Sequence, residues 1–79
     1  MKLPRDIDAI ELIKLLKAFG YQITRQKGSH IRITTTENGE HHITIPNHNP
    51  IKLGTLSSIL SEVATHFKLS KEDVANKLF

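Results

Sequence analysis

The 79-residue sequence contains no cysteine, and aromatic residues make up only 5% of it. Without cysteine there is no disulfide framework and no thiolate chemistry, which agrees with a reducing cytoplasm. Phe19 and Tyr21 fit core positions and are too few to form a platform on which bases could stack. No apolar run has the length of a signal peptide or membrane span, because Lys14 and Lys17 interrupt the longest one. We therefore expect a cytoplasmic protein without a membrane segment.

The size and charge of the chain set further limits. Seventy-nine residues suit a single domain, expected over residues 1–79, near the lower limit for a self-sufficient core. Eleven basic and eight acidic side chains give a net charge of +3, which alone is weak evidence for a polyanionic partner. The distribution says more, because residues 24–53 carry four basic residues, two acids and four of the five histidines.

The first segment has the apolar spacing of a helix. Asp8 and Glu11 have the spacing of a capping box, and Ile7 can pack on Leu12 as a hydrophobic staple. Gly20 is placed to end the helix in the left-handed conformation. The apolar stripe of this helix consists of Ala9, Leu12, Ile13, Leu16 and Phe19.

Three strands are expected next. Residues Tyr21–Gln26 alternate as a short strand with Tyr21 and Ile23 facing inward, and Lys27-Gly28-Ser29 forms the following turn. The second and third strands are expected at His30–Thr36 and His41–Ile45.

Burial decides the turn between the last two strands. A two-residue loop, Asn38-Gly39, would put Ile33 opposite Thr44 and mix the two faces. A three-residue loop, Glu37-Asn38-Gly39, pairs Ile33 with Ile43 and puts Gly39 where a type I turn plus bulge needs a left-handed residue. Because a one-residue slip inverts a strand, we favour the second loop. One exposed face then carries His30, Arg32, Thr34, His42 and Thr44.

Two more helices complete the prediction. After an irregular loop, Pro46–Leu53, a helix with Thr55 as N-cap ends near His66 or Phe67. Ser70 and Asp73 then give a capping signal for a short final helix. The order α-β-β-β-α, with this short extra C-terminal helix, predicts an α+β fold. Its helices pack on one face of a three-stranded antiparallel sheet and leave the other face open.

His30 carries the clearest chemical signal. It shares the exposed face with Arg32 and Thr34, so an imidazole lies beside a guanidinium and a hydroxyl. Imidazole can give or take a proton near neutral pH, and arginine binds anions. Proton transfer next to a bound phosphate is what RNA cleavage requires. A half-buried strand histidine without chemistry would show the same pattern.

Two motifs at a fixed separation carry a family resemblance. Gly28-Ser29-His30 enters the second strand, and Lys52-Leu53-Gly54-Thr55-Leu56 is followed by Ser58-Ile59-Leu60. Together they resemble the HicA-like (YcfA-type) toxins, small bacterial mRNA interferases with a double-stranded-RNA-binding-like fold. The resemblance spans nearly the whole chain, from Leu12-Ile13-Lys14 and Phe19-Gly20-Tyr21 to the last helix.

The resemblance implies roles for particular residues. His30 matches the family's functional histidine, and Ile45-Pro46 followed by His48 looks like its strand-end proline and nearby histidine. It also implies mRNA as substrate, a HicB-like antitoxin that covers the active face, and no small-molecule cofactor. The His41-His42 pair and the Asn47-His48-Asn49-Pro50 loop are less typical and bear on substrate preference.

The proposed chemistry needs two proton-transfer groups. His30 is expected to act as general base or general acid in transesterification, and one histidine cannot fill both roles at the same moment. His48 and His42 are the candidates for the second group, and each could equally be a solvated surface imidazole.

The remaining candidates would bind phosphate. Arg32 either holds a phosphate bidentately or is a cross-strand surface charge. Gly28 and Ser29 either present backbone N–H groups to phosphate or form an ordinary turn. The basic residues Arg25, Lys27 and Lys52 either contact the RNA backbone or are solvated charges.

No metal site is expected. His41 and His42 are neighbours on a strand and point to opposite faces, and the sequence has no His-x₃-His or cysteine pair. The leading hypothesis is a metal-independent endoribonuclease toxin. The alternatives are a nonenzymatic RNA-binding module that recognises duplex shape and a degenerate toxin that only binds its antitoxin.

Overall fold

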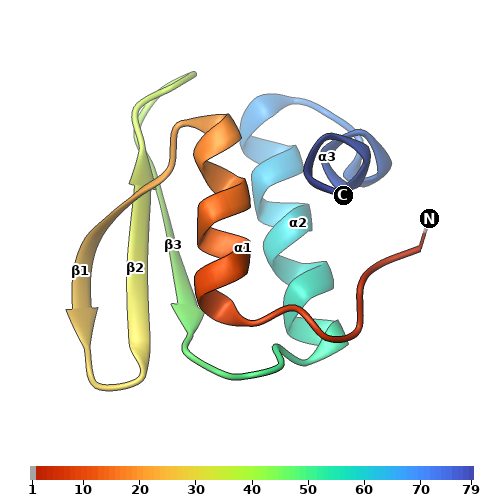
Figure 1. Cartoon of the computed structure of the whole chain (residues 1–79). Helices are drawn as coiled ribbons and strands as arrows, with labels where there is room; N and C mark the ends of the chain where they lie inside the picture. Colours follow the sequence, from red (N-terminus) through yellow and green to blue (C-terminus); the bar gives the residue numbers. More distant parts are fainter. Residues whose placement is uncertain (1) are drawn as a thin grey trace.

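The computed structural model describes residues 2–79 and consists of a sheet covered on one face by helices (Figure 1). The sheet has three antiparallel strands in the order β1-β2-β3, with α1 and α2 on one side of it and α3 beyond α2. The α+β class and the open face of the sheet are therefore confirmed. The elements are α1 (Ala9–Leu16), the 3₁₀ turn η1 (Lys17–Phe19), β1 (Gln22–Lys27), β2 (His30–Thr35), β3 (His41–Pro46), α2 (Leu53–Phe67) and α3 (Lys71–Leu78).

Helix α1 begins and ends close to where its sequence indicates. The Asp8 carboxylate accepts a hydrogen bond from the Glu11 amide at 2.8 Å, so the N-cap is confirmed. The last turn tightens into η1 before Gly20, which has φ +83°. The expected apolar stripe is buried, including Phe19 in η1.

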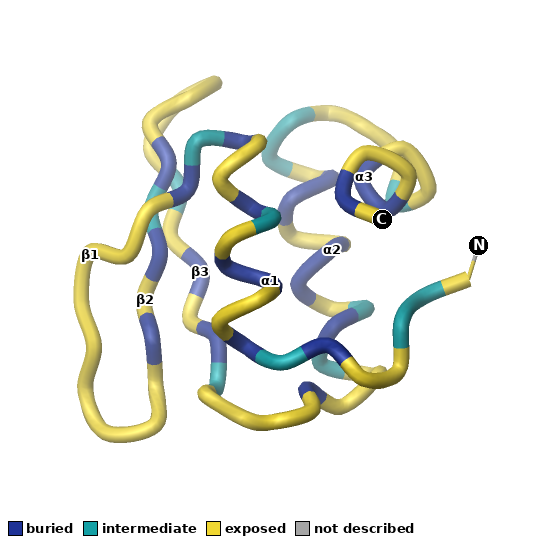
Figure 2. Tube along the Cα trace, in the orientation of Figure 1, coloured by how far each residue is buried: buried dark blue, intermediate teal, exposed yellow. Residues whose placement is uncertain are grey.

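The register of β2 and β3 is the one that burial selected. Ile33 pairs with Ile43, and Gly39 has φ +96° in the connecting turn. Asn38 is also left-handed, with φ +56°, a conformation that asparagine tolerates better than most residues. Along β2 and β3 the apolar residues are buried against the helices, and the residues between them lie on the open face (Figure 2).

Strand β1 departs from the prediction. Tyr21 is fully buried, but Ile23 is 50% exposed, so the expectation that both face inward is wrong for Ile23. Ile23 does pair with Ile33, but β1 is an outer strand that the helices do not cover (Figure 2). The strand also continues to Lys27, which leaves Gly28 and Ser29 as a two-residue hairpin turn.

Helix α2 begins earlier than the capping preference of Thr55 predicts. The N-cap is Lys52, without a side-chain capping bond, and Thr55 lies inside the first turn. Tertiary contacts explain the early start: Ile51 is buried, and its amide donates to the Ile7 carbonyl at 2.9 Å. This anchor fixes where the chain turns into the helix, and it overrides the capping preference of threonine.

The last helix follows its sequence signals. Ser70 and Asp73 form a complete capping box at the start of α3. Val74 and Leu78 are buried in the core. Within residues 2–79 no helix combines the length and apolar character needed to cross a membrane.

Candidate active site

An irregularity in β1 determines which side chains reach the open face of the sheet. Ile23 pairs with Ile33 and Arg25 pairs with Arg32, so three residues of β1 stand opposite two of β2 and Thr24 is the extra one. A bulge of this kind re-aims the side chains that follow it. Arg25 therefore joins Arg32 on the open face.

His30 lies at one end of that face, next to the hairpin turn. It is exposed, and it pairs with Lys27 on β1 and with Pro46 on β3. The Asn47 amide donates to the Ser29 carbonyl at 2.6 Å, which ties the loop after β3 to the turn before His30. The imidazole is therefore held at the start of the central strand, between β1 and β3.

A hollow surrounds His30, and three of its five lining residues carry a permanent positive charge. The lining residues are Arg25, Lys27, His30, Arg32 and Thr44. No carboxylate is among them, so the hollow attracts anions, and arginine can bind phosphate bidentately. Four of the site residues expected from the sequence are thus brought together. Thr44 was expected on this face but without a role.

Gly28 leaves the approach to the turn open. Its φ of +57° suits glycine, and a Cβ placed there would meet no atom within 4 Å. It stands first in the two-residue loop, as glycine does in type II′ hairpin turns. Ser29, the second loop residue, has its carbonyl engaged by Asn47.

Four polar side chains form a continuous hydrogen-bonded chain across the open face, away from the hollow. Thr24 Oγ1 lies 2.8 Å from Thr34 Oγ1, and Thr34 Oγ1 lies 2.7 Å from His42 Nδ1. His42 Nε2 lies 2.8 Å from a carboxylate oxygen of Glu40. Both ring nitrogens of His42 are engaged. His42 pairs with Thr34, four residues along β2 from His30, which corresponds to about 13 Å.

The other candidates lie outside the hollow. His48 is exposed in the loop after β3, where its carbonyl accepts from the Ala9 amide at 3.2 Å. Lys52 is the exposed N-cap of α2. The structure therefore brings neither residue into the cationic hollow with His30.

One comparison with known proteins assigns a family. Residues 10–64, more than half of the chain, match the family described as the HicA toxin of bacterial toxin–antitoxin systems. The chain belongs to the HicA toxin family. No curated protein and no solved structure matches it.

The family match covers the elements that build the site. In this HicA-family protein it runs from α1 into α2 and includes all three strands with His30 and the cationic hollow. Helix α3 lies outside the match. Membership in a family of toxin–antitoxin toxins implies an antitoxin partner.

A second group of polar and aromatic side chains, which the sequence did not reveal, lies between β3 and α2. The rings of His41 and His66 stack with centroids 4.5 Å apart, and the Tyr21 hydroxyl lies 2.8 Å from His41 Nδ1. His66 Nε2 reaches the carbonyls of Glu37 and Gly39 at 2.9 and 3.0 Å. Since these contacts join positions far apart in the chain, no spacing of residues in the sequence predicts them.

The electrostatics of this group favour a neutral His41. Burial lowers the pKa of His41 and the neighbouring His66 lowers it further; Glu62 acts in the opposite direction, and His42 adds a smaller lowering. Burial, with a contribution from Glu62, raises the pKa of Tyr21 to about 12. Tyr21 therefore keeps its proton, which a neutral His41 can accept at Nδ1.

This cluster predicts a pH-dependent stability. Because the pKa of His41 is lower in the fold than its ordinary value of 6.5, the unfolded chain binds more protons. The contribution of His41 to the free energy of unfolding is fully present above pH 6.5. It is lost as the pH falls from 6.5 towards the lowered pKa of His41. We expect urea unfolding to show a smaller free energy at about pH 5.5 than at about pH 7.5.

A variant isolates the contribution of His41. His41→Gln should reduce this difference, whereas His48→Gln, in an exposed loop, should leave it as in the wild type. Equal pH dependence in the wild type and His41→Gln would contradict the assignment.

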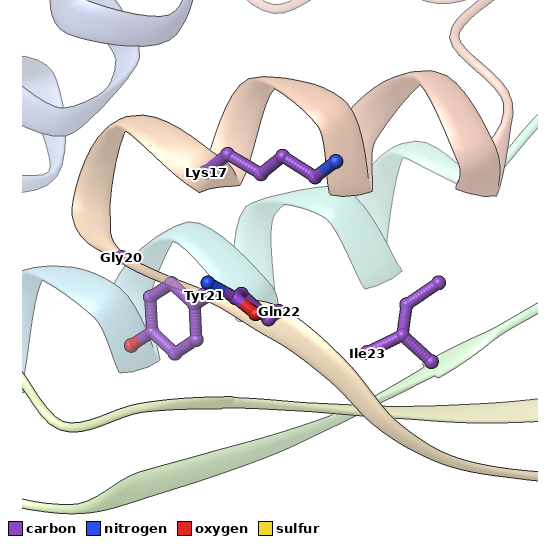
Figure 3. Close-up of a pocket in the computed structure, with 5 residues that line it drawn as sticks. All are labelled: Lys17, Gly20, Tyr21, Gln22 and Ile23. Carbon is purple, nitrogen blue, oxygen red and sulfur yellow. The ribbon is translucent and has the colours of Figure 1, made fainter.

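Another hollow lies between the end of the first helical segment and β1, and it lacks a free pair of acid–base groups. It is lined by Lys17, Gly20, Tyr21, Gln22 and Ile23. Figure 3 shows Lys17 extended along the helix and Ile23 rising from the strand on the other side. The Tyr21 hydroxyl is already hydrogen-bonded to His41. Lys17 is then the one charged group of the lining, and the hollow offers no pair of groups for proton transfer.

Proposed function

We propose that this protein is an endoribonuclease toxin that cleaves mRNA in the cytoplasm, independently of metal ions, and is neutralised by a HicB-like antitoxin. The observation that carries the proposal is the position of His30 in a hollow lined by Arg25, Lys27 and Arg32 on the uncovered face of the sheet. The HicA family match supports the toxin part of the proposal.

The arrangement suits transesterification within the RNA chain. His30 takes the proton of a ribose 2′-hydroxyl, the 2′-oxygen bonds to the adjacent phosphorus, and the bond from phosphorus to the 5′-oxygen breaks. A second group returns a proton to the 5′-oxygen. Arg32 neutralises the charge that develops on the phosphate oxygens, and Arg25 and Lys27 bind the phosphates of the RNA backbone.

His48 is the better candidate for the second group. Its loop follows Pro46, the residue paired with His30, and is tied to the turn before His30. His42 lies farther along the strand, and its two ring nitrogens already bond Thr34 and Glu40. We propose His48 as the proton donor and His42 as a structural residue.

The antitoxin is proposed to act by covering the same face. The hollow is open and cationic, so carboxylates of a HicB-like partner would compete there with RNA phosphates. Gly28 and Ser29 would then bring their backbone close to either ligand.

A cleavage assay tests the function. We expect the protein, with EDTA present, to cut a mixed-sequence RNA and leave a 5′-hydroxyl on the downstream product. A matched oligonucleotide with 2′-deoxyribose throughout should remain intact, because it lacks the attacking hydroxyl. Bound but uncut RNA would instead support the RNA-binding module, and a lack of RNA binding would support a domain that only binds its antitoxin.

A further inference from the structure

The bulge at Thr24 is what places two of the cations beside His30. If β1 continued in the register of the Ile23–Ile33 pair, Arg25 would stand opposite Ile31, whose side chain is buried against the helices. Lys27 would fall on that face as well, since side chains alternate along a strand. The extra residue reverses this, so that Arg25 pairs with Arg32 and Lys27 with His30.

The side chain of Thr24 is bound only to groups of β2. Its hydroxyl lies 2.8 Å from the Thr34 hydroxyl and 3.4 Å from the Arg32 carbonyl oxygen, so its one proton is shared between these two acceptors. Thr24 and Arg25 therefore both project to the open face, although they are consecutive residues. The bond to Thr34 attaches the bulged residue directly to the central strand.

The other hydrogen bonds of this row, at His42 and Glu40, set the direction of the bond between Thr24 and Thr34. A neutral His42 that donates from Nε2 to the Glu40 carboxylate has Nδ1 as an acceptor for the Thr34 hydroxyl. With its proton directed to His42, the Thr34 oxygen is free to accept from Thr24. A carboxylate just before β3 thus fixes, through His42, the orientation of the Thr34 hydroxyl next to Thr24.

We propose that Thr24 is a positioning residue, and that the chain Glu40–His42–Thr34–Thr24 holds the β1 bulge that turns Arg25 and Lys27 towards the phosphate site at His30. Its effect on RNA rests on the proposed function, whereas its effect on the register of β1 does not. His30 and Arg32 are held by the pairing of β2 with β3 and do not depend on the bulge.

Thr24→Val tests the proposal, because valine keeps the branched shape and removes the hydroxyl. We expect nuclear Overhauser contacts across β1 and β2 to show Arg25 losing its position opposite Arg32. In cleavage, KM should rise about tenfold, equivalent to one charge-assisted hydrogen bond, with kcat little changed. With two cations displaced, the log–log salt dependence of RNA binding should become shallower by about 1.4.

Three further variants separate positioning from general destabilisation. Thr24→Ser restores the hydroxyl and should restore KM. Thr34→Val breaks the same chain, so the double variant should be no worse than either single one. Thr36→Val removes an exposed threonine hydroxyl beyond the end of β2 and should behave as the wild type.

The two readouts separate the proposals. An unchanged register in Thr24→Val, or an unchanged KM with a changed register, would overturn the positioning role. If the wild type neither cuts nor binds RNA, the proposed function fails, while the register contacts still show whether Thr24 holds the bulge.

Discussion

Replacing His30 with alanine should reduce the kcat for RNA cleavage by roughly 10²–10⁴-fold, the usual contribution of a positioned proton-transfer group. The side chain is exposed and lies outside the hydrophobic core, so its loss should leave the free energy of unfolding nearly unchanged. Arg25, Lys27 and Arg32 stay in place in this variant. RNA binding should therefore persist, with an affinity within a few-fold of the wild type.

The measurement is single-turnover cleavage of a labelled RNA, with binding followed in parallel on a 2′-deoxy analogue. Gln26→Ala is a suitable control, since Gln26 is exposed on the same strand pair but pairs with Ile31 and so belongs to the other face. Full activity in folded His30→Ala would remove His30 from the mechanism and, with it, the argument from the cationic hollow.

Gly20→Ala should be the most damaging of the glycine substitutions, lowering the free energy of unfolding by about 2–4 kcal/mol. Gly20 has φ +83°, and a Cβ there would collide with the Glu37 carboxylate and come within 2.8 Å of Thr35 Oγ1. Thr35 is buried, and its hydroxyl donates to the Phe19 carbonyl at 2.8 Å. The substitution would thus strain the backbone and disturb the bond that joins β2 to the end of η1.

Gly28→Ala provides the matched control. Gly28 also has a positive φ, but a Cβ there would meet no atom within 4 Å, so only the backbone cost of about 1–2 kcal/mol applies. The total stability of a chain of this size is about 4–12 kcal/mol, which makes the difference measurable by urea unfolding. Equal losses in the two variants would show that the close approach to Thr35 and Glu37 is unimportant.

Much of the fold was predictable because it depends on local pattern. The caps at Asp8 and Ser70 and the stop at Gly20 are local hydrogen-bond and backbone preferences. The register of β2 on β3 was also predictable, since only one pairing buries all the isoleucines together. That register places His30 and Arg32 on one face.

The remaining errors have a common origin in contacts between distant segments. Thr55 is a reasonable N-cap by its chemistry, but Ile51 is buried and bonded to Ile7, and this sets the start of α2. Ile23 has the apolar character of a core residue, but β1 lies beyond the cover of the helices. Neither fact follows from the neighbouring sequence.

The candidate site also has a part that the sequence predicts and a part that depends on contacts between distant segments. The sequence by itself determined the motif that carries His30 and the alternation that sets it beside Arg32, because both depend on period-two geometry. Only the tertiary structure decided that Arg25 and Lys27 join them, through a bulge at Thr24 held by side chains from all three strands. After Ile23 the strand has no apolar residue to fix its face, so pairing with β2 makes the choice.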